Sequence, residues 1–191
     1  MAAARPLFLK RGYAGTTMAA IARDAGVVVE TVYRSFGSKV ALFGAVVEAA
    51  LAGGVERAEV PVEERPAIAA IIAETDPARQ VALYAATQPG IHRRAGPLLR
   101  AVRDAAALDP DVARVWRELE AQRYAGQGRL AGLLATRGAL REGLSVETAT
   151  DLIWTHTALA VHDLFVVERG WSSDRYETWL ANALTRELLG R

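Results

Sequence analysis

Residues 16–39 read TTMAAIARDAGVVVETVYRSFGSK. Thr16 and Thr17 offer an N-cap for a helix over 18–25, Gly26 ends that helix, and a second short helix is expected over 29–36. A three- to four-residue turn that begins with glycine packs two helices at a steep angle. The stretch therefore predicts a helix-turn-helix.

Two apolar faces hold this predicted pair together. Ile21, Ala22 and Ala25 share one side of the first helix, and Val32 and Phe36 share one side of the second. Packing these sides together leaves the other face of the second helix exposed. Such a slim helix can enter the major groove of DNA.

Residues that commonly begin and end helices recur along the whole chain on either side of 16–39, and no segment alternates polar and apolar residues with period two. Gly12, Ser38, Gly53 and Gly138 are expected to begin or end helices. We predict an all-α chain of about nine helices, with a bend or break near 76–77 in the fifth and a connection over 55–65. The expected ranges are 2–11, 18–25, 29–36, 39–52, 67–84 (ended by Pro89-Gly90), 97–106, 110–136, 146–169 and 174–189.

Charge separates the front of the chain from the rest. Residues 1–40 hold six Lys and Arg against two acids, a net of +4, while residues 41–191 hold 17 basic and 20 acidic residues, a net of −3. A basic head on a mildly acidic body is typical of a nucleic-acid-binding head. We therefore expect a DNA-binding domain over 1–52 and a second helical domain over 53–191.

Composition excludes several classes of protein. The 191 residues are 51% hydrophobic and include no cysteine, which excludes disulfides and cysteine-based zinc sites. No apolar run approaches the ~20 residues of a membrane span. The most apolar segment, 152–167, carries Asp163 and two histidines and predicts a buried helix. The start of the chain lacks the layout of a secretion signal, so we expect a cytoplasmic protein.

The segment LFLKRGYAGTTMAAIARDAGVVVETVYRSFGSKVALF, residues 7–43, resembles the DNA-binding region of the TetR family of transcriptional regulators. It matches in register over about 37 residues, from Leu7-Phe8 to Leu42-Phe43. One departure is Val28, which stands where the family usually has Ser or Thr, so the second helix lacks its usual N-cap. The resemblance implies an N-terminal three-helix DNA-binding head and a C-terminal helical domain that binds a small ligand and dimerises.

The resemblance also implies phosphate contacts from Thr17, Thr31, Tyr33 and Lys39, whose hydroxyl and ammonium groups suit phosphate oxygens. Val29 and Arg34 are candidates for base contacts, since arginine can fork to guanine and valine can touch a thymine methyl. Glu30 repels phosphate but could accept from a cytosine amino group. The alternative for Tyr33 is packing on the preceding helix, and for Arg34 and Lys39 a plain surface charge.

The predicted function is that of a ligand-responsive regulator, most simply a repressor, that binds a palindromic operator as a homodimer through its last two helices. The effector is not identified by the sequence. Its pocket is predicted from large or polar groups among apolar neighbours, each of which could instead belong to the core. These candidates are Tyr84, Trp116, Tyr124, Trp154, His156, His162 and Phe165.

Two rival readings are an enzyme and a helical scaffold of the same fold that has lost DNA binding. His92, His156, His162 and Asp163 could move protons or bind metal, but the two histidines of 152–167 are six residues apart, a poor spacing for ligands on one helix. No nucleophile motif or phosphate loop is present. We therefore expect no enzymatic activity, no metal and no cofactor. Val28 and Glu30 support the scaffold alternative.

Overall fold

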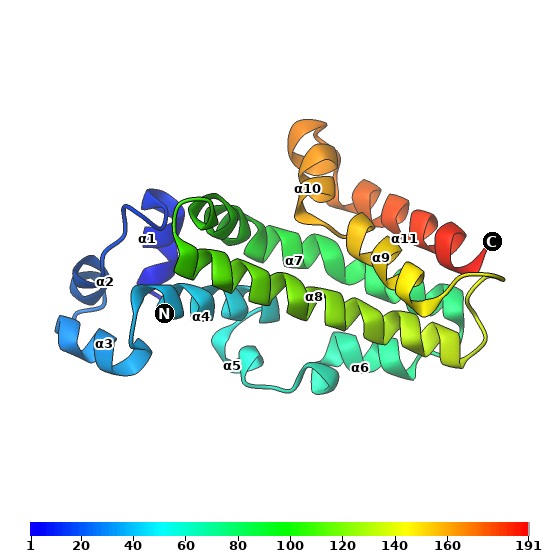
Figure 1. Cartoon of the computed structure of the whole chain (residues 1–191), viewed down its shortest axis with the longest axis horizontal. Coiled ribbons are helices and arrows are strands. Elements are labelled where there is room, and N and C mark those ends of the chain that lie inside the picture. The colour runs from blue at the N-terminus through cyan, green and yellow to red at the C-terminus, as the bar shows by residue number, and fades with distance from the viewer. Residues whose placement is uncertain (191) are drawn as a thin grey trace. The chain divides into compact units, whose positions relative to one another are not determined.

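The computed structural model describes residues 1–190 and is all-α in that range, with 77% of the chain in helices and no strand (Figure 1). This confirms the predicted fold class. The α-helices are α1 (Ala4–Arg11), α2 (Met18–Asp24), α3 (Val29–Phe36), α4 (Lys39–Ala52), α5 (Val55–Ala58), α6 (Pro66–Ala73), α7 (Pro77–Ala106), α8 (Pro110–Thr136), α9 (Val146–His156), α10 (Leu159–His162) and α11 (Ser173–Leu189). A 3₁₀ turn, η1 (Val62–Glu64), and a π-helical segment, η2 (Asp163–Glu168), complete them.

The chain forms two compact units. The first comprises residues 1–59 and 94–119, and the second comprises 60–93 and the described residues from 120 onward. The long helices α7 and α8 each contribute to both units. The first unit thus contains the predicted head together with the end of α7 and the start of α8.

Side-chain caps set the helix boundaries in the first unit as the sequence predicts. The Thr17 hydroxyl accepts a hydrogen bond from the Ala20 amide (3.1 Å), and the Ser38 hydroxyl accepts one from the Ala41 amide (3.2 Å). Val28 holds the N-cap position of α3 and makes no side-chain cap. Gly53 ends α4 in the left-handed conformation, which glycine adopts without a Cβ clash.

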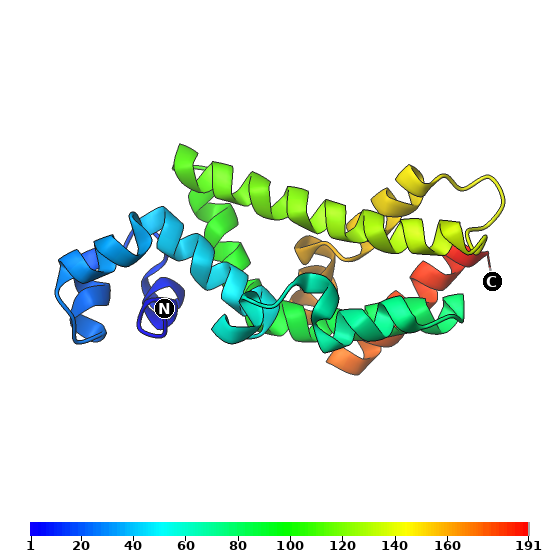
Figure 2. The same cartoon turned by 90° about the horizontal axis from the view of Figure 1, so that it is seen from below.

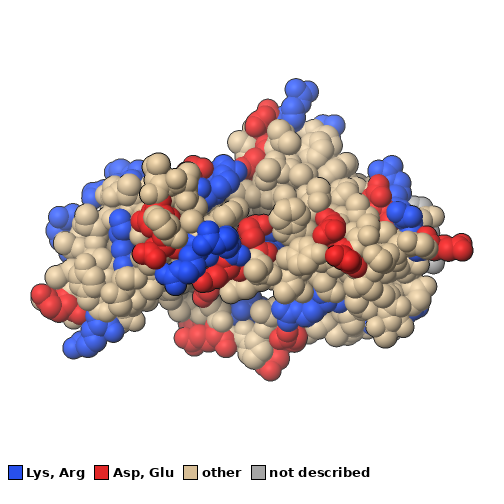
Figure 3. Space-filling model, in the orientation of Figure 1, with Lys and Arg blue, Asp and Glu red and all other residues tan. Residues whose placement is uncertain are grey.

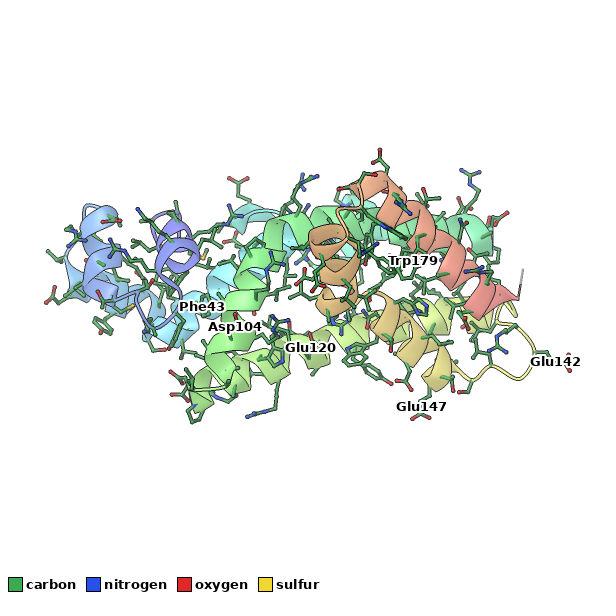
Figure 4. The ribbon with its side chains drawn as sticks, turned by 90° about the horizontal axis from the view of Figure 1, so that it is seen from above. Phe43, Asp104, Glu120, Glu142, Glu147 and Trp179 are labelled. Carbon is green, nitrogen blue, oxygen red and sulfur yellow. The ribbon has the colours of Figure 1, made fainter. Side chains whose placement is uncertain are left out.

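The core of the first unit is aromatic at its centre. The ring of Phe43 lies 4.5 Å from that of Phe8 and 5.3 Å from that of Tyr13, centroid to centroid (Figure 4 labels Phe43 on α4). Ile21, Ala22 and Val32 are buried as predicted, and Phe36 packs against this core. Ala25 was expected to face inward but is exposed, because α2 ends at Asp24 and the turn begins there.

The second unit buries a separate apolar core under α11. Tyr176, Leu180, Leu184 and Leu188 are fully buried along α11 and pack with Ile153 of α9. The spacing of four along α11 is that of one helix face. This core and the polar groups beside it lie in the part of the chain where the sequence predicts the ligand pocket.

The prediction that Pro89-Gly90 ends a helix and that another begins at Pro97 is wrong. α7 runs unbroken from Pro77 to Ala106 through both prolines. A proline inside a helix removes a hydrogen bond and costs about 3 kcal/mol. The turns before and after Pro89 are anchored by fully buried Val81, Ala85 and Leu98. This burial offsets the local cost.

The predicted single helix over 146–169 is also wrong. α9 ends at His156, Ala158 is extended (φ −62°, ψ 142°), and α10 and η2 follow. At the break the Thr157 hydroxyl is within hydrogen-bond distance of the Ile153 carbonyl (2.7 Å) and of the Gln127 side-chain amide (2.8 Å), a side-chain alternative to the helix. The segment 152–167 is not buried all round, since Leu164 is 52% and Val167 60% exposed.

Smaller differences concern helix ends. The last helix begins at Ser173 with Ser172 as its cap, one residue earlier than predicted. The expected connection over 55–65 contains the short α5 and η1, and the predicted break near 76–77 separates α6 from α7. Within residues 1–190, no single helix is long and apolar enough to cross a membrane. The bent pair α3 and α4, at 68°, passes that test of length and composition together.

Candidate functional site

The turn between α2 and α3 sets the geometry of the predicted interface. Gly26 has φ 69°, a conformation that residues with a Cβ rarely adopt, and the Val27 amide donates to the Ala22 carbonyl (3.0 Å). Figures 1 and 2 both show α2 and α3 side by side at the N-terminal end of the chain. The arrangement is a helix-turn-helix.

One side of α3 packs against the core of the first unit, and its other side is exposed to solvent. Val32 is buried with 6% exposure, and Val29 packs partly against the same core. Tyr33 is 50% exposed, Glu30 and Arg34 are exposed, and Thr31 is half-buried. The side chain of Tyr33 is therefore not part of the buried core of the first unit. The space-filling view shows Lys and Arg side chains over this end of the chain, with an acidic group beside them (Figure 3).

Two predicted phosphate contacts flank α3. Thr17 is exposed and caps α2 with its hydroxyl, which leaves the donor of that hydroxyl available. Lys39, at the start of α4, donates from Nζ to the Tyr13 carbonyl (3.0 Å) and lies 4.0 Å from the centre of the Tyr13 ring. Lys39 is thus oriented by Tyr13, at the N-terminus of a fourteen-residue helix whose end carries partial positive charge.

The predicted pocket residues do not form one group. Trp116 belongs to the first unit, where it packs against the core, and the other six lie in the second. Tyr124 is exposed and donates to Asp151 (2.9 Å), and exposed Trp154 lies under the Arg123 guanidinium (4.7 Å). Tyr84 packs against the core of the second unit.

The remaining three pocket candidates join an aromatic cluster. His162 stacks on His92 with ring centroids 4.4 Å apart, and Phe165 stacks on Trp171 at 4.4 Å. His156 and Phe165 both contact Trp179 of α11 (6.0 and 4.5 Å; Figure 4 labels Trp179). A surface groove of about 400 Å³ runs over the outer side of this cluster, lined by Trp171, Asp174, Arg175, Thr178, Trp179 and Asn182.

The sequence analysis missed a set of buried polar side chains in the second unit. Gln80, Gln88 and His92 share one face of α7 with Tyr84, each four residues after the last. Gln127 and Thr157 are also buried. The spacing of four was a usable signal, but the incorrect break at Pro89-Gly90 divided the stripe.

Burial controls the ionisation of these groups. The pKa of His92 is lowered to about 3, first by its burial and then by the neighbouring His162. Burial likewise raises the pKa of Tyr84 and of Tyr176. These groups are therefore uncharged at neutral pH and can act as hydrogen-bonding groups. No cluster of three or more His, Cys, Asp and Glu side chains suited to a metal ion occurs in the described part of the chain.

Comparison with known proteins agrees with this architecture. Residues 1–46 match the family model described as bacterial regulatory proteins, tetR family. A comparison with curated protein sequences finds no match.

Solved structures match the chain over nearly its whole length. A protein described as a TetR-family transcriptional regulator from Mesorhizobium loti MAFF303099 is 21% identical with a TM-score of 0.73, covering 97% of this chain and 91% of that one. The transcriptional regulator FadR from Bacillus subtilis, in complex with stearoyl-CoA, is 16% identical with a TM-score of 0.72, covering 100% and 96%. A protein from Saccharomonospora viridis described as a transcriptional regulator, in complex with choline, is 17% identical with a TM-score of 0.69, covering 97% and 93%.

At these identities the structural likeness establishes the fold, and the match over 1–46 adds the identity of the head. The chain therefore carries the DNA-binding domain of the TetR family on the fold of TetR-family transcriptional regulators.

Proposed function

We propose that this protein is a ligand-responsive transcriptional repressor that acts in the cytoplasm and binds a palindromic operator as a homodimer. The observation that carries the proposal is the outward face of α3, where Tyr33, Arg34 and Glu30 are exposed on a helix anchored by Val32. A helix held in this way can lie in the major groove with its side chains against base edges.

The residues have distinct proposed roles. Thr17, Thr31, Tyr33 and Lys39 contact phosphates, which position the protein on the duplex, and Val29, Glu30 and Arg34 face the bases. The Tyr13 carbonyl and ring direct Lys39, so its ammonium is already oriented before DNA arrives. One such module buries little surface, and two are needed for useful affinity.

The second unit supplies the sensor. FadR binds stearoyl-CoA and the protein from S. viridis binds choline. These ligands differ in charge and shape, so the likeness selects no ligand class for this chain. We propose that a small effector bound in the second unit favours a conformation in which the two α3 helices no longer fit one operator. An effector shifts this equilibrium only through a difference in affinity for the two conformations.

A gel-shift assay tests DNA binding. The probes are the intergenic fragments that flank the gene of this protein, and the control is a Tyr33→Ala, Arg34→Ala double variant. We expect the wild-type protein to retard at least one fragment and the variant to retard none at the same concentration, with unchanged circular dichroism. If folded wild-type protein retards no fragment, the helical scaffold is the better description.

A further inference from the structure

Buried polar side chains are distributed unevenly in this molecule. Among the described residues, eight polar side chains are buried, and all except Thr16 lie in the second unit. The seven are Gln80, Gln88, His92, Gln127, Thr150, Thr157 and His162. Polar groups inside a protein lower its stability unless they are paired, so a concentration of them points to a use other than packing.

Several of these groups lie side by side. The stacked rings of His92 and His162 both meet the ring of Tyr176 edge-on, at centroid distances of 6.2 and 5.2 Å. Tyr176 is fully buried, and the ring of Trp179 lies 5.9 Å from its own. Three helical segments, α7, α10 and α11, therefore converge on one polar and aromatic interior.

Four buried atoms in this unit lack a hydrogen bond of normal geometry within residues 1–190. They are the Tyr176 hydroxyl, the side-chain oxygen of Gln80 and both ring nitrogens of His92, although the Thr157 backbone lies near enough to that ring to act against the lowering of its pKa. A buried unpaired donor or acceptor costs about 1 to 3 kcal/mol. Of these, the His92 ring and the Tyr176 hydroxyl lie together, and a neutral imidazole and a phenol hydroxyl can each donate and accept, which is the complement that a hydroxyl or amide group requires.

The charges around this interior are already paired. Arg123 forms an ion pair with Glu120 (2.8 Å) and donates to the Trp154 carbonyl (2.8 Å). The Asp163 carboxylate has a hydrogen-bond partner in Nδ1 of His162, 3.3 Å away. The low pKa of His92 keeps that ring neutral. A charged ligand would have to leave water without a free counter-charge, which is costly.

We propose that this interior is the effector site and that it takes an uncharged, largely apolar molecule carrying an amide or hydroxyl group. His92 and Tyr176 are its recognition residues, and the rings of His162 and Trp179 provide apolar surface beside them. This assignment rests on the proposed function only where it calls the ligand an effector. Ligand binding is measured without DNA, so it is tested separately from DNA binding.

The test compares three probes that share a benzene ring: benzamide, benzoate and benzyltrimethylammonium. Binding at millimolar concentration is followed by ligand-observed NMR and by the shift in Tm of the full chain. We expect benzamide to bind and to raise Tm, and the two charged probes to do neither. The same comparison tests whether the site prefers a neutral amide to a carboxylate and to a quaternary ammonium group.

Two variants locate the site. Tyr176→Phe removes only the unpaired hydroxyl, and His92→Phe replaces the unpaired ring by an apolar one. Each is expected to weaken benzamide binding about 3- to 10-fold, the value of one hydrogen bond. Thr155→Val is the control, because it removes an exposed hydroxyl from the same unit, and it should leave binding unchanged.

Stability gives a second readout. Removing an unpaired buried hydroxyl leaves a smaller desolvation cost, so Tyr176→Phe should keep or raise Tm while it loses binding. A merely structural hydroxyl would lower Tm instead. The proposal is overturned if a charged probe binds as tightly as benzamide, if both variants bind benzamide like the wild type, or if no probe binds. If the protein still retards its operator in any of these cases, this inference is wrong and the proposed function stands.

Discussion

At the scale of single residues, two side chains proposed to contact phosphate differ in their contacts within the folded protein. Tyr33 is half exposed, and its side chain is free to meet DNA. Lys39 is already bound to Tyr13 through a hydrogen bond and a cation–π contact. The two residues should therefore differ in what their removal does to the folded protein, although both are proposed to contact phosphate.

We expect Tyr33→Ala to weaken operator binding with little change in Tm, and Lys39→Ala to weaken binding and also lower Tm. The loss of the Lys39 contacts to Tyr13 is the reason for the difference, since cation–π pairs contribute about 0.5 to 1 kcal/mol at exposed sites. Titration of a labelled operator and thermal melts measure the two effects. Equal melts for the two variants would contradict the role given to Tyr13.

Arg34→Ala should act on sequence preference rather than on binding to all DNA. A base-contacting arginine contributes about 1 to 3 kcal/mol of discrimination at one base pair. Competition with operators changed at single positions measures this preference. If Arg34→Ala weakens binding to every sequence equally, Arg34 contacts phosphate and the base assignment is wrong.

His92 predicts a specific dependence of stability on pH. Its pKa is about 3 in the folded chain and ordinarily 6.5, so between these values the unfolded chain binds a proton that the folded chain does not. The free energy of unfolding must then fall as pH falls through this window, by roughly 2 kcal/mol between pH 7 and pH 5. His162 opposes protonation of His92, as does Arg123, while Asp163 favours it.

Urea denaturation at pH 7 and at pH 5 measures this loss. The His92→Phe variant should lose less stability between the two pH values than the wild type, because it cannot take up that proton. If both proteins lose the same amount, protonation of other groups accounts for the acid sensitivity.

At the scale of elements, the helices of the head differ in how they begin. α2 and α4 have hydroxyl caps, whereas α3 begins at Val28, which is 65% exposed and caps nothing. The helix proposed to enter the groove is therefore the least well capped of the three. Its position depends on Val32 and on the turn at Gly26.

Val28→Ser should stabilise the head by about 1 kcal/mol, because a serine hydroxyl at this extended position can accept from the Thr31 amide, which without a side-chain cap donates to the Val28 carbonyl (3.0 Å). Val28→Ala is the matched control and should change little, since the side chain is mostly exposed. Chemical denaturation followed by circular dichroism measures both. No gain from serine would show that the amides of the first turn are not within reach of a cap.

The break between α9 and α10 depends on a single hydroxyl. Thr157→Ala should destabilise the protein by about 1 to 3 kcal/mol, because it removes a buried hydroxyl that bonds to the Gln127 side chain and to the Ile153 carbonyl. Thr155→Ala, at an exposed position on the same helix, should have little effect. Urea denaturation compares the two. A similar cost for both would mean that the Thr157 hydroxyl does not support the break.

At the scale of the whole molecule, the proposed homodimer needs an apolar surface on the last helices. η2 exposes Leu164 (52%) and Val167 (60%), which are apolar side chains without cover in the single chain. Dimer interfaces place such residues at their buried centre. We therefore propose this surface as part of the contact between two copies.

Leu164→Glu should convert the dimer to a monomer, because it introduces a charge into an apolar interface, and should abolish operator binding through loss of the second α3. Light scattering after size exclusion measures the mass. Leu108→Glu, at an 89% exposed position between α7 and α8, is the control and should remain dimeric. A monomeric wild-type protein would contradict the proposed mode of operator binding.

Elements whose signals are local could be predicted from the amino-acid sequence alone. The bounds of α3, α4 and α8 follow from caps, glycines and the Asp109-Pro110 start, and the outward face of α3 follows from the burial of Val32. These features depend on residues within a few positions of one another, so one chain without relatives suffices. The exposed face of α3 suggested Val29, Glu30 and Arg34 as base contacts, whereas the phosphate contacts of Thr17, Thr31, Tyr33 and Lys39 came from the resemblance to the TetR family.

The interior of the second unit became apparent only in the three-dimensional structure. Helix α7 continues through Pro89 because its flanking turns are buried, and α9 ends because Thr157 finds Gln127, thirty residues away. Both outcomes depend on contacts between distant residues, which local propensity does not contain. The convergence of His92, His162 and Tyr176 arises for the same reason: the energy of packing distant segments together exceeds the local preferences of each.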